Sequence, residues 1–208
     1  RWPDLYMAVN LSPVQVRDPA LVEQVAGMLD RYGVPASRLV LEVTEGVLID
    51  NPDEAKARLD ALQALGIRLA LDDFGTGYSS LTYLQRFKFD KLKIDKGFVE
   101  PLGRNADSQA LVQAIVALGR ALDLTLLAEG VETEEQRVLL RLAGCQEMPG
   151  YLFARADSRE ALDRLLAEPD FPRRDNIVAF LAHRDGGEAV APLLAFLQNP
   201  PASVTVPE

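Results

Sequence analysis

The residues of this chain that are best suited to chemistry are two adjacent carboxylates, Asp72 and Asp73, which follow a short apolar run and precede Gly75 and Gly77. The run Arg68–Leu71 predicts a buried strand, and parallel α/β folds keep their functional residues at the carboxyl ends of strands. Carboxylate oxygens suit Mg²⁺ or Mn²⁺, and glycine lets the backbone approach a ligand closely. Taken alone, the pair fits a metal site and a solvated turn equally well, because Asp and Gly are also ordinary turn residues.

Polar residues also end the other strand-like runs of the sequence. These runs alternate with helical patterns, an order that implies parallel strands whose carboxyl ends lie on one face. Packing several carboxylates together costs Coulomb energy unless cations neutralise them, so we expect a cation site there. Lys93 would either pair structurally with the acids or orient a water or phosphate. The five run ends are Asn10-Leu11-Ser12, Glu42-Val43-Thr44-Glu45, Asp72-Asp73, Lys93-Ile94-Asp95 and Glu129-Gly130-Val131-Glu132.

The expected elements form strand and helix pairs. Strands are expected over residues 6–11, 38–44, 68–71, 88–94, 124–128 and 147–153, and helices over 19–32, 52–65, 107–122, 133–143 and 158–167. Glycines at 33 and 66 are expected to end the first two helices, and Thr133 with Gln136 to form a capping box. In the third helix, Leu111, Ile115, Leu118 and Leu122 are expected on one face. This order favours an α/β fold of the (β/α)₈ barrel type with its opening strands missing, and an open doubly wound sheet is the alternative.

Composition sets the class of protein. A chain of 208 residues that is 48% hydrophobic should bury roughly 70% of the surface that its unfolded form exposes. The net charge of -9 argues against a nucleic-acid polymer as partner, although metal ions would still allow a phosphate ligand. The single Cys145 permits no internal disulfide and is expected to be a small buried residue. No apolar run approaches the roughly 18 residues that a membrane segment needs, so we expect a cytoplasmic location, either free or in a larger membrane-attached protein.

These motifs, together with Asp72 through Leu81 and Gly150-Tyr151-Leu152-Phe153, resemble the ordered motif set of the EAL-domain family. The resemblance runs from about Met7 to Ala167. It implies a TIM-like barrel of the EAL type, present here without its first two strands. It also implies a metal-dependent phosphodiesterase that hydrolyses the bacterial second messenger cyclic di-GMP to linear pGpG. It also implies a homodimer and two ions of Mg²⁺ or Mn²⁺ per active site, with Ca²⁺ expected to inhibit.

The resemblance assigns roles to individual residues. It makes Asn10, Glu42 and Asp72 ligands of a first metal ion and Asp73 a ligand of the second. Lys93 and Glu129 are implied to be tied to the attacking water and the metal centre, and Asp73 is implied to be catalytic with them. Glu45 is implied to anchor a loop that couples metal binding to dimer contacts, and the loop residues are Phe74, Gly75, Thr76, Gly77 and Tyr78. Substrate binding is implied for Asp95, Glu132 and Gly150.

Two departures from the family pattern leave a second hypothesis open. The strand with the family's Glu-x-Leu motif, which supplies a further metal ligand, is expected upstream of Arg1, so this fragment alone is expected to be impaired. Pro149 stands where the family has glutamine, and proline offers neither a side-chain hydrogen bond nor a backbone N–H. A non-catalytic cyclic di-GMP receptor is therefore the alternative. Residues 1–168 are expected to form the barrel domain and 169–208 a helical extension and tail.

Overall fold

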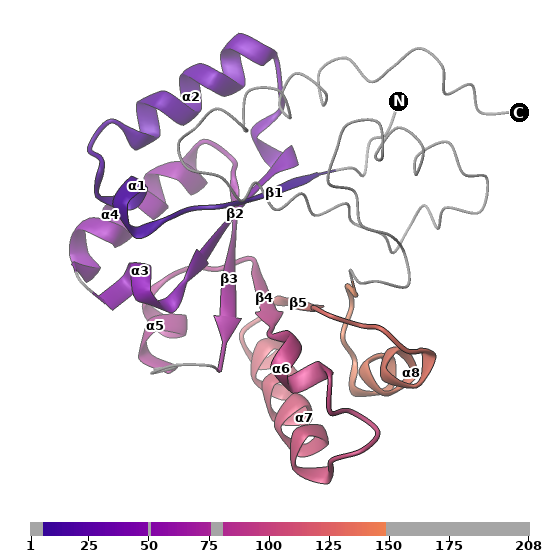
Figure 1. The fold of residues 1–208 in the computed structure, drawn as a ribbon. Helices are drawn as coiled ribbons and strands as arrows, with labels where there is room; N and C mark the ends of the chain where they lie inside the picture. Colours follow the sequence, from indigo (N-terminus) through magenta and orange to yellow (C-terminus); the bar gives the residue numbers. More distant parts are fainter. Residues whose placement is uncertain (1–5, 50, 76–80, 149–208) are drawn as a thin grey trace, which may run out of the picture.

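The fold is a parallel sheet flanked by helices, seen in a computed structural model that describes residues 6–49, 51–75 and 81–148 (Figure 1). Neighbouring strands pair in the order in which they occur in the sequence, and all pairs are parallel. The carboxyl ends of the strands therefore meet at one edge, as predicted. The strands are β1 (Met7–Asn10), β2 (Leu39–Thr44), β3 (Arg68–Phe74), β4 (Lys91–Ile94) and β5 (Thr125–Ala128).

The strand order and one long-range contact show that the sheet belongs to a barrel. A doubly wound sheet reverses its strand order at a switch point, whereas here the order is sequential. In a flat sheet β1 and β5 would lie roughly 19 Å apart, at about 4.8 Å per strand spacing. Yet the Tyr6 hydroxyl donates a hydrogen bond of 2.8 Å to Glu147, which lies beyond β5 and bridges to Leu127. The sheet is curled, so the (β/α)₈ interpretation is confirmed and the doubly wound alternative is wrong.

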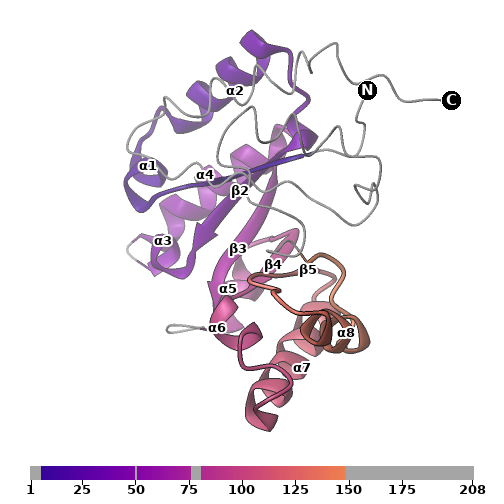
Figure 2. The same cartoon turned by 45° about the vertical axis from the view of Figure 1, so that its right-hand side comes forward.

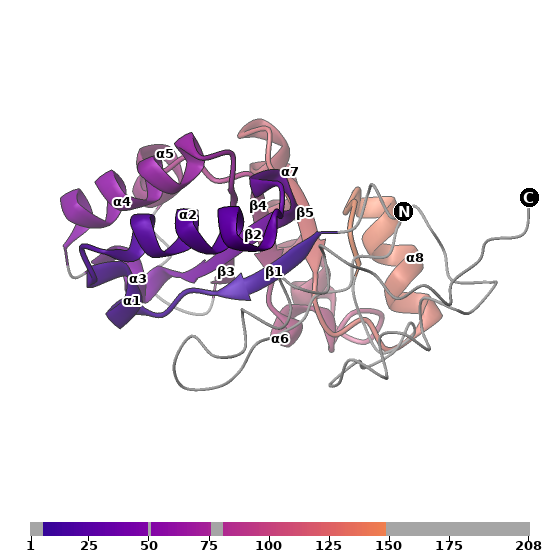
Figure 3. The same ribbon diagram turned by 90° about the horizontal axis from the view of Figure 1, so that it is seen from above.

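The helices begin and end largely where the sequence predicts. Gly33 ends the first long helix with a φ of 60°, and Thr133 and Gln136 form the predicted capping box of the last. Figure 3 shows α2, α4 and α5 together on one side of the sheet, and Figure 2 shows α7 beside α8. The helices are α1 (Pro13–Arg17), α2 (Leu21–Tyr32), α3 (Glu45–Ile49), α4 (Pro52–Ala64), α5 (Leu81–Arg86), α6 (Lys96–Val99), α7 (Ala106–Ala121) and α8 (Glu134–Ala143), with a 3₁₀ turn at Ala36–Arg38.

Three short helices, α1, α3 and α6, follow the ends of β1, β2 and β4, and the sequence did not predict them. Each is too short to show a helical repeat of apolar residues. Caps hold two of them: Ser12 and Gln15 form a capping box at α1, and the Asp95 side chain accepts a hydrogen bond from the Gly97 N–H at α6. These helices turn the chain away from the sheet directly after each strand end.

The apolar core has two separate parts. The larger part fills the space between the sheet and the helices, and Cys145 belongs to it, as predicted. The smaller part consists of Tyr6, Ala8, Val40 and Ala70, which lie on the opposite face of β1 to β3. Because side chains alternate between the faces of a strand, the residues two positions on from this small cluster also face the barrel interior. The interior face therefore carries a thin apolar layer with polar residues on either side of it.

Two expectations about the elements need correction. The strand at Arg68 continues to Phe74 and so contains both aspartates. In α7, Leu111 is exposed rather than on the buried face, because Ser108, Val112 and Ile115 line the side that meets the sheet. Of the expected strand at 147–153, the bridge at Glu147 is observed. Residues 149–208, including the expected helix at 158–167 and the expected helical extension and tail of 169–208, lie outside the described residues.

Candidate active site

Four charged side chains meet at the carboxyl edge of the sheet, around the ammonium group of Lys93. Its Nζ lies 2.6 Å from Oε2 of Glu42, 2.8 Å from Oε1 of Glu129 and 2.9 Å from Oδ1 of Asp72. Lys93 and Glu42 are each 2% exposed, Asp72 is 8% exposed, and Glu129 is half-buried. We call these four residues the Lys93 cluster. The structure thus brings together four of the residues that the sequence singled out.

The alternation of side chains between the two faces of each strand places this cluster. Glu42 follows Val40 by two positions, and Asp72 follows Ala70 in the same way, so both face the barrel interior above the small apolar layer. The parallel register places Asn10 beside Glu42 and Lys93 beside Leu127, two residues before Glu129. Each side chain therefore comes from a different strand or strand end, which fixes the cluster through the backbone of the sheet.

The electrostatics of the cluster keep Lys93 charged. Burial opposes the charge of its ammonium group, but the carboxylates of Glu42, Glu129 and Asp72 outweigh burial and raise the pKa of Lys93 above its ordinary value. Lys93 therefore carries its proton at neutral pH and cannot serve as a general base there. Three carboxylates around one ammonium leave an excess of negative charge, which favours a further cation at this edge.

Asp73 is exposed, unlike its neighbour Asp72, and it lies where the end of β3 is irregular. The register of β3 against β4 shifts between Leu71 and Phe74, and Asp73 has a φ of 54°. Its backbone N–H donates a 2.9 Å hydrogen bond to Oδ1 of Asp72, and its side chain is exposed. Partial burial and the charges of Asp72 and Asp95 raise the pKa of Asp73. The two aspartates thus face different surroundings: one belongs to the Lys93 cluster and the other is open to solvent.

Asn10 and Glu45 lie at the same edge. Asn10 ends β1 opposite Glu42 and is half-buried, so its amide is placed beside the cluster. Glu45 begins α3, is 9% exposed, and acts electrostatically on Asp73. Of the loop that Glu45 is expected to anchor, Phe74 packs in the main core and Gly75 is exposed. Thr76, Gly77 and Tyr78 lie outside the described residues.

The residues expected to bind substrate are more scattered. Asp95 caps α6 with a 2.8 Å hydrogen bond from the Gly97 N–H, which is a structural role in its own right. Glu132 is exposed, and its backbone N–H donates to Oε1 of Gln136 at the start of α8. Gly150 and Pro149 lie outside the described residues.

The donor chemistry of this edge suits a hard divalent cation. Carboxylates and an amide oxygen are the ligands that Mg²⁺ and Mn²⁺ prefer. Within the described part of the chain, however, no group of three or more His, Cys, Asp or Glu is spaced to hold a metal ion. The ammonium of Lys93 lies among the carboxylates and sets their separation. The residue types therefore fit a metal, and the ammonium shows that the carboxylates can surround a cation.

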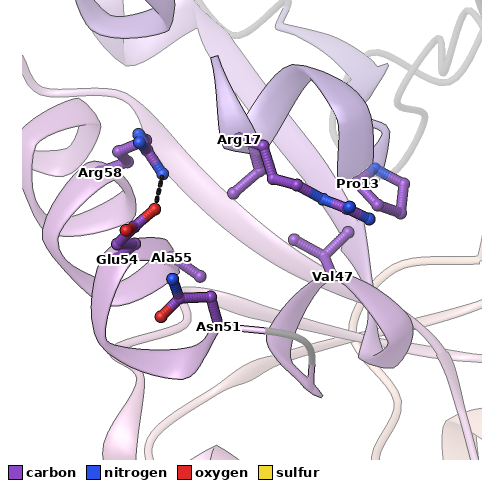
Figure 4. A pocket seen from close by; sticks show the side chains of 8 residues that line it. Pro13, Arg17, Val47, Asn51, Glu54, Ala55 and Arg58 are labelled. Atoms are coloured by element: carbon purple, nitrogen blue, oxygen red, sulfur yellow. Dashed lines mark hydrogen bonds and ion pairs between the residues drawn. The ribbon is translucent and has the colours of Figure 1, made fainter. Parts of the chain in front are cut away.

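A shallow recess between α1, α3 and α4 is a different feature (Figure 4). Its polar contacts include the ion pair of Arg58 and Glu54, with an N–O distance of 3.2 Å. It shares no residue with the Lys93 cluster, so it is not part of the candidate active site. Its lining consists of Pro13, Val16, Arg17, Val47, Asn51, Glu54, Ala55 and Arg58.

Sequence reasoning missed a second buried charged group, formed by Tyr6, Lys91 and Glu147. The Lys91 ammonium lies 2.5 Å from the Tyr6 hydroxyl and 2.6 Å from Oε2 of Glu147, and it is also 4.0 Å from the centre of the Tyr6 ring. We call these three residues the Lys91 network. The signal available in the sequence was the spacing of Lys91 and Lys93, since residues two apart on a strand face the same side.

Comparison with known proteins yields one consistent family. The EAL domain family profile matches residues 2–156. The chain is 45% identical over 159 residues to the bifunctional diguanylate cyclase/cyclic di-GMP phosphodiesterase MucR of Pseudomonas aeruginosa, covering 76% of this chain and 23% of MucR. It is 42% identical over 149 residues to the cyclic di-GMP phosphodiesterase RocR of the same organism, covering 72% and 38%. The chain thus spans well under half of these relatives.

Solved structures show the same likeness. The phosphodiesterase PaMucR in a c-di-GMP complex superposes with a TM-score of 0.72 at 45% identity, covering 76% of this chain and 64% of that one. A manganese/cy-diGMP complex of Klebsiella pneumoniae BlrP1 gives a TM-score of 0.68 at 36% identity, covering 72% and 38%. PaMucR was thus solved with c-di-GMP, and BlrP1 with manganese and cy-diGMP together.

Proposed function

Because this chain belongs to the EAL domain family, we propose that it is part of a metal-dependent phosphodiesterase that hydrolyses cyclic di-GMP to linear pGpG. The observation that carries the proposal is the Lys93 cluster, where Glu42, Asp72 and Glu129 surround one ammonium at the carboxyl edge of the sheet. The relatives named as phosphodiesterases support the substrate. The chain covers only part of each relative, so the activity is proposed for the protein to which these residues belong.

The proposed metal ligands are the oxygen donors of this edge. Asn10, Glu42 and Asp72 would hold a first Mg²⁺ or Mn²⁺, and Asp73 would contribute to a second. Bound there, the ions would lower the pKa of a water and neutralise charge on the phosphate. The different exposure of Asp72 and Asp73 supports two positions rather than one, because Asp72 is buried in the Lys93 cluster and Asp73 is exposed at the irregular end of β3.

The chain's own side chains have distinct tasks in this proposal. Lys93 stays charged, so it holds the carboxylates in place and presents a positive charge toward a phosphate or an attacking water. Glu129 is the half-buried member of the cluster, which leaves it open to a water from solvent. We therefore assign to Glu129 the orientation of the attacking water and the acceptance of its proton.

The test is turnover by the full-length protein with Mg²⁺ or Mn²⁺, followed by chromatography of the nucleotides. We expect pGpG as the product and its loss in Glu42→Gln, because the variant removes a charged oxygen donor and leaves Lys93 with fewer carboxylates. Glu54→Gln is the matched control, since Glu54 belongs to an exposed ion pair on α4. Near-normal turnover by Glu42→Gln would refute the assignment of the site, and no turnover with either metal would refute the activity.

Pro149 supports a second candidate function, a cyclic di-GMP receptor without catalysis. Proline cannot replace the hydrogen bonds of the family's glutamine at this position. The receptor predicts tight binding of cyclic di-GMP in Ca²⁺ by calorimetry and no product in Mg²⁺. The phosphodiesterase instead predicts product in Mg²⁺ and inhibition by Ca²⁺.

Further parts of the proposal concern the assembly and the setting of the protein. We propose a homodimer in which Glu45 anchors the loop 74–80, and in which this loop links metal binding to the contacts between subunits. We also propose that 169–208 form an extension outside the barrel domain of 1–168. A cytoplasmic site of action would agree with a bacterial second messenger as substrate. None of the helices in the described residues is long and apolar enough to cross a membrane.

A further inference from the structure

Phe98, a residue with no role in the site described so far, lies against the end of β3. Gly75 follows the bulge at Asp73, and a Cβ placed on Gly75 would be 2.9 Å from both Cε2 and Cζ of Phe98. Real Cβ atoms do not approach ring carbons so closely, so the Phe98 ring fills the space that any other residue at position 75 would need. Figure 1 shows α6, which carries Phe98, beside the end of β3.

The end of β3, where the Phe98 ring lies against Gly75, contains one non-glycine residue in a sparsely populated backbone conformation. Asp73 has a φ of 54° and Gly75 a φ of 96°. A non-glycine residue with positive φ persists only where surrounding contacts hold it. One such contact is the 2.9 Å hydrogen bond from the Asp73 N–H to Asp72. The Phe98 ring is a second, because it blocks Gly75 from moving toward α6.

Phe98 is itself held firmly. It is half-buried and packs against the main core, and its backbone N–H donates a 3.0 Å hydrogen bond to the Asp95 carbonyl. The Asp95 side chain caps the same short helix through Gly97. The core therefore backs the Phe98 ring on the side away from Gly75.

We infer that Phe98 is a positioning residue: its ring holds the bulged end of β3, which carries Asp73 next to Asp72 of the Lys93 cluster. The inference rests on the proposed function, because it concerns the two aspartates as ligands of separate metal positions. A residue that supports a metal ligand without touching the metal typically changes metal affinity when removed. Phe98 acts in this way through Gly75.

The test uses the full chain with Mn²⁺ as the probe, and it compares Phe98→Ala with Phe89→Ala. Phe89 is a buried phenylalanine before the other end of β4, so its loss removes a ring of the same size far from the site. We expect Phe98→Ala to weaken Mn²⁺ binding by about tenfold in calorimetry and Phe89→Ala to change it by less than about twofold, although both lower the thermal midpoint. Phe98→Leu, which keeps an apolar side chain against Gly75, should restore most of the affinity.

A second readout separates this inference from the proposed function. Hydrogen exchange of the segment 71–75 should be faster in Phe98→Ala than in Phe89→Ala, because the strained backbone loses its support. If the unaltered chain bound no Mn²⁺, the proposed metal site would be refuted, and exchange alone would decide the role of Phe98. Unchanged exchange in a folded Phe98→Ala, or Mn²⁺ binding equal to that of the unaltered chain, would overturn the inference.

Discussion

Breaking the Lys91 network should destabilise the barrel strongly, and replacing Glu147 should cost more stability than replacing Lys91. The network joins β1 to the segment after β5 through the hydrogen bond of Tyr6 to Glu147 and the ion pair of Lys91 and Glu147. The Lys91 side chain is 3% exposed, whereas that of Glu147 is 19% exposed. Replacing one partner leaves the charge of the other without compensation, and the cost in stability is larger when the charge that remains is the more deeply buried one.

The expected magnitudes follow from that difference. Glu147→Gln leaves the ammonium of Lys91 buried without a carboxylate and should lower the free energy of unfolding by about 3 kcal/mol. Lys91→Met leaves Glu147, which still accepts from Tyr6 and reaches solvent, so its cost should be about 1 to 2 kcal/mol. The double variant should cost less than the two single changes together, with a coupling of about 1 to 2 kcal/mol.

Denaturant unfolding and thermal unfolding of the full chain measure these effects. For a chain of this length, about 3 kcal/mol corresponds to a shift of roughly 6 to 12 °C in the thermal midpoint. Glu134→Gln is the control, since its ion pair with Arg137 is exposed and contributes little. If Lys91→Met were more destabilising than Glu147→Gln, or if both were within about 0.5 kcal/mol of the unaltered chain, the role of this network in closing the barrel would be refuted.

Two further predictions concern other buried positions. Burial raises the pKa of the Cys145 thiol to about 12 from an ordinary value of 9.0. Because the unfolded chain then loses the thiol proton before the folded chain does, the contribution of the thiol to stability is complete below about pH 9 and is lost as the pH rises through the folded pKa. The free energy of unfolding falls by at most about 1.4 kcal/mol per pH unit over this range. Urea unfolding at several pH values from neutral to alkaline should show this loss of stability in the unaltered chain and not in Cys145→Ala. If the thiol of the folded chain reacted with a thiol reagent at pH 8 as fast as the thiol of the urea-unfolded chain, the reasoning would be contradicted. Gly144→Ala should destabilise by about 1 to 3 kcal/mol, because Gly144 has a φ of 104° and its Cβ would collide with the Arg120 guanidinium. In the double variant with Arg120→Ala, the collision is removed but the strain of alanine at positive φ remains, so only part of the lost stability should return. A thermal midpoint equal to that of Arg120→Ala alone would count against a backbone cost.

The sequence predicts best those features that depend on local chemistry. Gly33 ends a helix because it can adopt positive φ, and Thr133 with Gln136 caps one because the two side chains satisfy each other's backbone groups. Asp72 and Glu42 were predicted at the same edge of the sheet because strand ends in a parallel sheet must coincide. These rules use only residue type and order in the chain.

Features that depend on the curvature of the sheet were not predictable in this way. The contact between Tyr6 and Glu147 spans 141 positions, and it exists only because the sheet curls. The exposure of Leu111 has a similar origin, since the face that α7 presents to the sheet depends on how the helix lies across β4 and β5. The bulge at Asp73 likewise arises from pairing with β4, which the run Arg68–Leu71 does not reveal.

The two buried lysines of β4 show why position alone does not identify a functional charge. Lys91 and Lys93 both face the barrel interior, and both are 2% exposed. Among the described residues, Lys91 contacts one carboxylate, that of Glu147, and shares the Tyr6 ring with the guanidinium of Arg68, so positive charge is in excess there. Lys93 contacts three carboxylates, so negative charge is in excess around it. Only the second arrangement attracts a further cation, and it lies at the edge where the strands of a parallel barrel end. The charge balance, and not the burial of either lysine, therefore separates the structural lysine from the one proposed to act in hydrolysis.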